Sequence, residues 1–116
     1  MLNPLTTQIW FYPNPIDFRK QIDGLVILVA DSLEKHPTSG ELFLFRNRGA
    51  DKLKILYWEE NGFWLYYKRL EKGRFVFPPI SDSVFSITNQ QLSWLLSGIG
   101  LFSHPVMESM NMQHFY

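Results

Sequence analysis

Residues 41–75 read ELFLFRNRGADKLKILYWEENGFWLYYKRLEKGRF and contain the strongest β-strand and turn signals of the chain. They carry nine aromatic side chains and eight Lys or Arg. Runs rich in aromatic and branched residues, separated by turn residues, predict β-strands at 41–46, 53–59 and 63–70. Asn61-Gly62 predicts a two-residue type I′ turn, because that turn needs positive φ at both central positions. The stretch therefore reads as two β-hairpins that carry basic groups.

A turn at 61–62 would also set which residues face each other across the second hairpin. It puts Leu56 and Trp58 on one face with Leu65 and Tyr67, and it places Lys54 directly opposite Arg69. Like charges in that position destabilise a sheet. Either a bound phosphate or the nearby Glu71 carboxylate would relieve the repulsion, and the carboxylate is the default.

Outside this stretch, Ile9–Tyr12 predicts a first strand and 84–87 a short edge strand. Apolar residues at helical spacing predict a helix from Pro15 to Lys35, with Asn14 as its cap. Thr88 and Gln91 form a capping box that opens a second helix. The expected fold is α+β: an antiparallel four- to five-stranded meander sheet with two helices packed on one face. We expect residues 1–100 to form a single domain, followed by a tail at 101–116.

The bulk composition restricts the class of protein. The chain has 116 residues, 46% of them hydrophobic, which is enough for one globular core. It contains no cysteine, which excludes disulfides and thiol catalysis and fits a reducing compartment. It also has no apolar run of the ~18 residues that a membrane span needs, and no signal-peptide pattern. We expect a cytoplasmic protein without a membrane partner.

Formal neutrality hides a charge asymmetry. Residues 46–74 hold eight basic and four acidic side chains, whereas the segments on either side are net acidic. A positive field confined to one part of the chain favours a polyanionic partner, although a solvated sheet face would also carry such residues. The predicted nucleic-acid contacts are Arg19, Lys20, Arg46, Arg48, Lys52, Lys54, Lys68, Arg69, Lys72 and Arg74.

Motifs for catalysis are missing. The glycines do not form a phosphate-binding loop, no nucleophile elbow is present, and the histidines lack metal-ligand spacing. Asp17, Asp51, Glu59 and Glu60 could in principle build a two-metal nuclease site, but nothing in their spacing brings them together. The sequence therefore predicts no catalytic residue, metal or cofactor. Asp17, Arg19 and Lys20, placed at the start of the first helix, offer a phosphate grip instead.

Three segments together carry a family resemblance: IDFRKQIDGL at 16–25, SGELFLFRNRGADKLKILYWEENGFWLYYKRLEKGRFVFP at 39–78, and ITNQQLSWLLSGI at 87–99. The chain resembles the transposon accessory protein family TnpB of the insertion-sequence family sixty-six, the product of the second reading frame of those elements. The family's usual threonine and methionine are replaced here by Ile16 and Phe18. The resemblance covers about residues 16–99, and the stretch from Leu101 onward is not placed by it.

The resemblance implies a non-enzymatic helper in DNA transposition, encoded beside a separate transposase. The family supplies no established catalytic residues, and DNA contact follows from the basic segment alone. The expected partners are DNA and the transposase of the same element, with a homo-oligomer also open. The rival function is a protein–protein adaptor with no affinity for nucleic acid, in which the Trp-Tyr hairpin or the Met-rich tail contacts the transposase.

Overall fold

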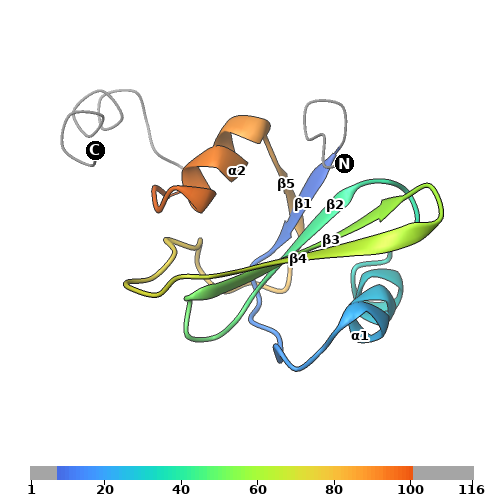
Figure 1. Ribbon diagram of the computed structural model, residues 1–116, viewed down its shortest axis with the longest axis horizontal. Coiled ribbons are helices and arrows are strands. Elements are labelled where there is room, and N and C mark those ends of the chain that lie inside the picture. Colours follow the sequence, from blue (N-terminus) through green and yellow to red (C-terminus); the bar gives the residue numbers. More distant parts are fainter. Residues whose placement is uncertain (1–7, 101–116) are drawn as a thin grey trace.

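The computed structural model describes residues 8–100 as one five-stranded sheet with helices on both sides (Figure 1). The strands are β1 (Ile9–Tyr12), β2 (Leu42–Arg46), β3 (Lys52–Glu59), β4 (Gly62–Arg69) and β5 (Phe85–Ile87). The helical segments are α1 (Ile22–Ile27), its π-helical continuation η1 (Leu28–Ser32) and α2 (Asn89–Leu96). The α+β class and the five strands are as the sequence predicts. None of the described helices is long and apolar enough to cross a membrane. The predicted tail at 101–116 lies outside the described residues.

The sheet is not a simple meander. Its strand order is β4-β3-β2-β1-β5, and β1 runs parallel to β2. A parallel pair needs a crossover connection rather than a hairpin, and residues 13–41, which include α1 and η1, supply it. Only β2, β3 and β4 form the predicted antiparallel succession.

The prediction that both helices cover one face is wrong. Side chains of β2 alternate between two cores: Leu42 and Leu44 join the core that α2 covers, whereas Phe43 and Phe45 join the core beneath α1 and η1. Figure 1 shows α1 and α2 on opposite sides of the sheet. Because the crossover and the C-terminal helix cover different faces, every side chain of β2 is buried. A central strand buried on both faces loses the polar alternation that marks a half-exposed strand.

The first helix begins later than predicted, at Ile22 rather than Pro15. Asn14 does not cap it; the Asn14 amide instead donates to the Asp82 carboxylate at 2.9 Å. The preceding segment is tied to the sheet, because the Ile16 N–H donates to the Arg46 carbonyl at 3.0 Å. Ile16 and Phe18 then pack on the α1-side core from a non-helical segment that ends in a turn. Their spacing to Ile22 only resembled a helical repeat.

The β3–β4 turn also differs from prediction. Glu59 pairs with Gly62, so the two loop residues are Glu60 and Asn61, and the register moves by two positions. Lys54 therefore faces Tyr67, and Lys52 is the residue opposite Arg69. A shift of two leaves every side chain on its predicted face, so the predicted sharing of a face by Leu56 and Leu65 is confirmed. Among the loop residues positive φ occurs at Glu60 alone, at 55°, whereas a type I′ turn needs two such residues.

Replacing Glu60 by glycine should stabilise the protein. An L-residue in the left-handed region loses ~1–2 kcal/mol, and glycine avoids most of that cost. We expect Glu60→Gly to raise the free energy of unfolding by about 1 kcal/mol in urea denaturation. Glu60→Ala is the matched control, since it removes the same carboxylate but keeps the strained φ. Equal stability of the two variants would show that the backbone at Glu60 carries no strain.

The capping box of α2 is confirmed. The Thr88 hydroxyl accepts from the Gln91 N–H at 3.0 Å, and the Gln91 side chain accepts from the Thr88 N–H at 2.9 Å. The helix buries Leu92 and Leu95. After Leu96 the chain reverses at Gly98, whose φ of 85° suits a glycine that ends a helix.

Candidate nucleic-acid interface

Lys54 is a buried structural residue rather than a surface contact. It is 2% exposed, and its ammonium donates to the Phe18 carbonyl at 2.9 Å and to the Lys20 carbonyl at 2.7 Å. The Phe18 ring lies 4.9 Å from the ammonium. Burial lowers the pKa of Lys54. Because this buried ammonium holds the turn before α1, it cannot contact an external anion. The prediction that Lys54 contacts nucleic acid is therefore wrong.

Arg46 is the second predicted contact that the fold buries. It is 7% exposed and stacks over the Phe77 ring at 4.6 Å. Its Nε donates to the Asn47 carbonyl at 3.1 Å. Burial, followed by repulsion from Arg48, lowers the pKa of Arg46. The prediction that Arg46 meets an external anion is therefore wrong for the same reason as for Lys54.

Two backbone hydrogen bonds gather the other basic residues of the segment at one end of the sheet. The Leu70 N–H donates to the Asp51 carbonyl at 2.8 Å, and the Phe75 N–H donates to the Ala50 carbonyl at 2.7 Å. They join the β2–β3 turn, residues 47–51, to the chain that leaves β4, residues 70–75. These two segments and the adjoining strand ends carry Arg48, Lys52, Arg69, Lys72 and Arg74, which we call the basic end.

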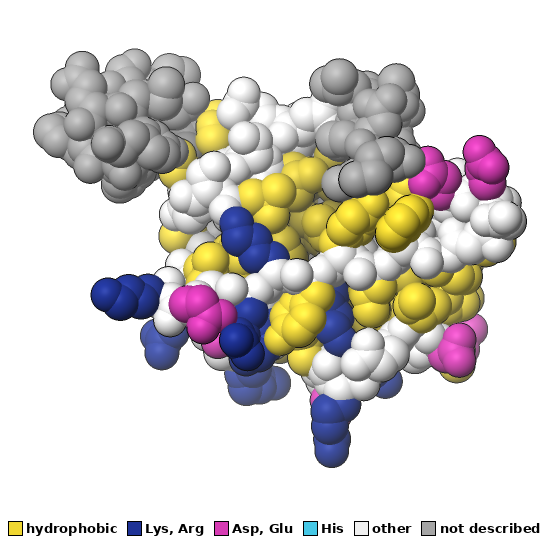
Figure 2. Space-filling model, viewed as in Figure 1, with side chains coloured by type: hydrophobic (Ala, Val, Ile, Leu, Met, Phe, Trp, Pro, Cys, Tyr) yellow, Lys and Arg dark blue, Asp and Glu magenta, His cyan; other side chains and the backbone are white. Residues whose placement is uncertain are grey.

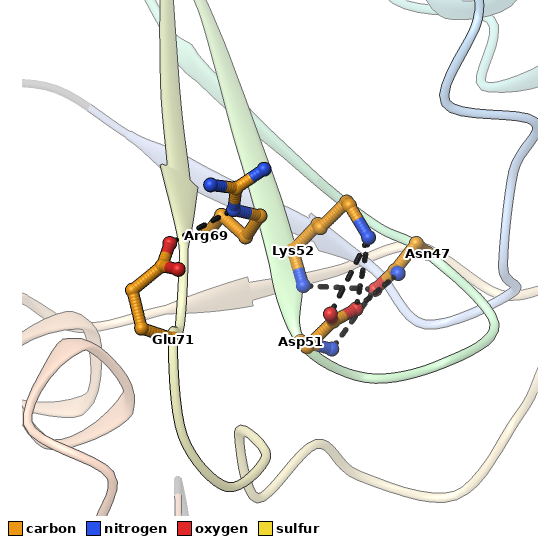
Figure 3. A network of polar contacts seen from close by, with 5 residues as sticks. All are labelled: Asn47, Asp51, Lys52, Arg69 and Glu71. Atoms are coloured by element: carbon orange, nitrogen blue, oxygen red, sulfur yellow. Dashed lines mark hydrogen bonds and ion pairs between the residues drawn. The ribbon is translucent and has the colours of Figure 1, made fainter.

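Asn47 organises the turn of the basic end (Figure 3). Its amide donates to the Asp51 carboxylate at 2.6 Å, and its side-chain oxygen accepts from the N–H groups of Asp51 and Lys52 at 3.2 and 2.9 Å. The sequence indicated only a turn-rich connector here. Asparagine side chains often accept hydrogen bonds from backbone N–H groups that follow them in a turn. Asn47, a few residues before Asp51 and Lys52, was therefore the sequence signal for this arrangement.

Replacing Asn47 by alanine should loosen this turn. Losing these hydrogen bonds should lower the free energy of unfolding by about 1–2 kcal/mol. The bond from Asn47 is also the main cause that lowers the pKa of Asp51, so this pKa should return toward its ordinary value. A lowered native pKa gives stability above the ordinary pKa that is lost as pH falls through the native one. The variant should therefore lose less stability on acidification, measured by urea denaturation and carboxyl NMR titration, whereas Asn61→Ala should change neither.

Several cations of the predicted set meet nearby carboxylates. Lys52 lies 3.3 Å from Asp51, and Arg69 lies 2.9 Å from Glu71 (Figure 3). The Arg19 guanidinium bonds the Asp17 carboxylate at 2.6 Å, which holds the pKa of Asp17 well below its usual range. Each pair joins residues one or two positions apart at the surface, where ion pairs contribute little. Such a pair can exchange its carboxylate for a phosphate at small cost.

The remaining cations have no carboxylate in contact. Lys20, Arg48, Lys72 and Arg74 are exposed, and no ion pair among residues 8–100 includes them. Arg19 and Lys20 sit in a turn closed by the Lys20 N–H to Asp17 carbonyl bond at 3.1 Å, rather than in the first turn of a helix as predicted. Lys68 differs from these four, because it donates to the Leu96 carbonyl at the end of α2 at 3.0 Å. A cation at that place also complements the helix dipole.

Acidic side chains occupy the opposite end of the sheet. Glu59 and Glu60 stand at the β3–β4 turn, and Glu41 precedes β2, whose first residue pairs with Tyr57 near that turn. Figure 2 shows most dark blue side chains at the left and bottom of one face, with some magenta among them, and further magenta side chains toward its right. The molecule is therefore polarised along its strands, although its formal net charge is zero.

The carboxylates do not assemble a metal site within the described part of the chain. Residues 8–100 contain no group of three or more His, Asp or Glu side chains that could hold a metal ion. Asp17 and Asp51 are engaged with Arg19 and with Asn47 and Lys52. His104 and His114 lie outside the described residues.

Comparison with known proteins gives the family. The model of the family described as IS66 Orf2 like protein matches residues 7–104. Two curated relatives come from Sinorhizobium fredii, and both are named uncharacterized proteins. The chain is 39% identical to y4jC over 85 residues, 73% of each chain, and 37% identical to y4hO over 98 residues, 84% of each. No solved structure matches. Since the match spans both helices and all five strands, the chain belongs to the IS66 Orf2-like family of TnpB-type accessory proteins of transposition.

Proposed function

We propose that this protein is a non-enzymatic accessory factor that binds DNA during transposition through its basic end and the adjacent turn at Arg19 and Lys20. The observation that carries the proposal is the gathering of Arg48, Lys72 and Arg74, which have no carboxylate in contact, on two segments joined by backbone bonds. Phosphates are the natural ligands of such a group, because Lys and Arg contacts to the backbone of DNA supply most non-specific affinity.

The contact set of the proposal is smaller than the sequence predicted. Arg46 and Lys54 are removed by burial, and Lys68 is committed in part to α2. The remaining contacts are Arg19, Lys20, Arg48, Lys52, Arg69, Lys72 and Arg74. Contacts of this kind position a protein on a duplex without reading its sequence. We therefore propose a factor that adds affinity and orientation, while recognition of the element's ends belongs to its partner transposase.

The test is direct binding to DNA, with the transposase as a second arm. Fluorescence anisotropy with labelled duplex and single-stranded oligonucleotides should show binding at low salt, with little dependence on sequence. Co-purification with the transposase of the same element, carried out after nuclease treatment, tests protein contact separately. If neither form of DNA binds while the transposase still co-purifies, the adaptor function replaces the present proposal.

A further inference from the structure

The two edges of the sheet differ in how they are protected. Natural proteins shield edge strands by keeping them short or by placing charges and prolines on them, because an open edge pairs with other chains. One edge is β5, which has three residues. The other is β4, which has eight residues in unbroken register with β3, no proline, and charges only at its last two residues, Lys68 and Arg69. Trp64 and Tyr67 on β4 are 48% and 55% exposed.

The direction of the free backbone groups on β4 follows from one hydrogen bond. Because the Leu70 N–H bonds the Asp51 carbonyl, Asp51 and Leu70 form a hydrogen-bonded pair of the antiparallel ladder. Bonded and non-bonded pairs alternate along such a ladder. Counting back from Leu70, the backbone groups that point away from β3 belong to Phe63, Leu65, Tyr67 and Arg69. No other strand of residues 8–100 pairs with this edge.

The charges along β4 are self-complementary. The turn that begins the strand carries Glu59 and Glu60, whereas its far end carries Lys68 and Arg69, followed by Lys72. An antiparallel partner with the same sequence would place its basic end beside the acidic turn of the first copy. A zero formal net charge adds no general repulsion between two copies.

We propose that β4 pairs antiparallel with β4 of a second copy across a two-fold axis at Tyr66, forming a ten-stranded sheet. In this register the backbone groups of Phe63 form hydrogen bonds with those of Arg69 in the second copy, and the backbone groups of Leu65 with those of Tyr67 in the second copy. All four outward-pointing residues of each strand are then paired. On one face Trp64 lies opposite Lys68 of the second copy, and on the other Phe63 lies opposite Arg69. Both are cation–aromatic pairs, which are attractive. The Lys68 ammonium has donors to spare beyond the one used at Leu96.

Neighbouring registers satisfy fewer groups. A two-fold axis at Leu65 would pair Arg69 with Asn61, a turn residue, and would set Lys68 opposite Gly62. It loses both cation–aromatic pairs and two of the backbone bonds. The axis at Tyr66 also brings the turn that carries Glu60 toward the segment of the second copy that carries Lys72. The proposal concerns the β4 edge, which shares Arg69 with the basic end, and it does not depend on DNA binding.

Sedimentation equilibrium of the unaltered chain is the first test. Edge pairing buries less surface than a standard interface of about 1,600 Å², so the dimer should be weak and form at roughly 10–100 μM protein. A monomer at every concentration up to roughly 1 mM would overturn the proposal, and would leave β4 free for an extended segment of another protein.

Cysteine cross-linking tests the register, since the chain contains no native cysteine. Tyr66→Cys should form a disulfide dimer quickly under mild oxidation, because residues in a non-bonded antiparallel pair have Cα atoms about 4.5 Å apart, within the range that a disulfide spans. Trp64→Cys is the control on the same strand and face: its two sulfurs would be four residues apart, about 13 Å, and should not join. Ser86→Cys on the β5 edge controls for random collision. Cross-linking of Tyr66→Cys no faster than that of the two controls would overturn the register.

Discussion

Lys54→Met should lower the free energy of unfolding by about 2–3 kcal/mol, although it keeps most of the side-chain volume. The substitution removes a charged donor from two carbonyl groups, those of Phe18 and Lys20, which the ammonium contacts at 2.9 and 2.7 Å. A hydrogen bond to a charged group contributes roughly 1.5–3 kcal/mol. The cost of burying the ammonium offsets part of this contribution. Urea denaturation measures the effect, and faster amide exchange over residues 16–24 should accompany it.

Lys52→Met is the matched control for this change. Lys52 lies on the same strand and face, two residues earlier, but it is half-exposed and its ammonium meets only Asp51. Surface changes of this kind usually fall within ~0.5 kcal/mol. Equal losses in the two variants would show that the buried ammonium does not hold the turn before α1. Folded Lys54→Met protein should keep its affinity for DNA, because Lys54 is not a surface contact.

Reversing the charges of the basic end should abolish most DNA binding. Each phosphate contact is worth close to tenfold in affinity near 0.1 M salt, so Arg48→Glu should raise Kd about tenfold and Arg48→Glu/Arg74→Glu about 100-fold. Both side chains are exposed, and neither is in an ion pair of the described residues. The folded structure should therefore be unaffected, which circular dichroism and the unfolding midpoint can verify.

The control for charge reversal is Lys35→Glu. Its ammonium lies 3.6 Å from the centre of the Trp10 ring, whose N–H donates to Glu41 at the acidic end. The substitution changes the net charge by the same amount as Arg48→Glu but away from the basic end. Kd should stay within about twofold of wild type, since phosphate affinity comes from contacts rather than net charge. If Lys35→Glu weakens binding as much as Arg48→Glu, a local interface is contradicted.

Much of the fold could be predicted because its signals are local. The capping box at Thr88 needs only four residues, and the strands of the hairpin follow from alternation. The loop consists of Glu60 and Asn61 and not of the Asn-Gly pair that the turn rule predicts. The predicted β3–β4 register is therefore wrong by two residues, but the side chains still lie on the predicted faces. The face of a side chain depends only on whether the register shift is even or odd. Which residue lies opposite Lys54, Tyr67 or Arg69, depends on which residues form the loop.

The buried cations could not be predicted in the same way. Whether Lys54 is a surface or a core residue depends on the segment before α1, which lies 34 and 36 positions earlier in the chain and covers it. That cover exists because β1 and β2 are parallel, which places the crossover helix on one face and leaves α2 the other. In retrospect, Lys54 between Leu53 and Ile55 in a central strand was the signal. A lysine at such a position must either reach solvent on one face of the sheet or donate hydrogen bonds to buried acceptors.

The salt dependence of DNA binding shows whether the basic end contacts phosphates. If the basic end releases counterions at four or five phosphates, log Kd should rise with log salt at a slope of about 4, which weakens binding about 250-fold between 50 and 200 mM salt. The slope should fall by about 2 in Arg48→Glu/Arg74→Glu, one unit for each lost contact. An affinity that does not change with salt, or a slope that the double variant leaves intact, would contradict an interface built from these cations.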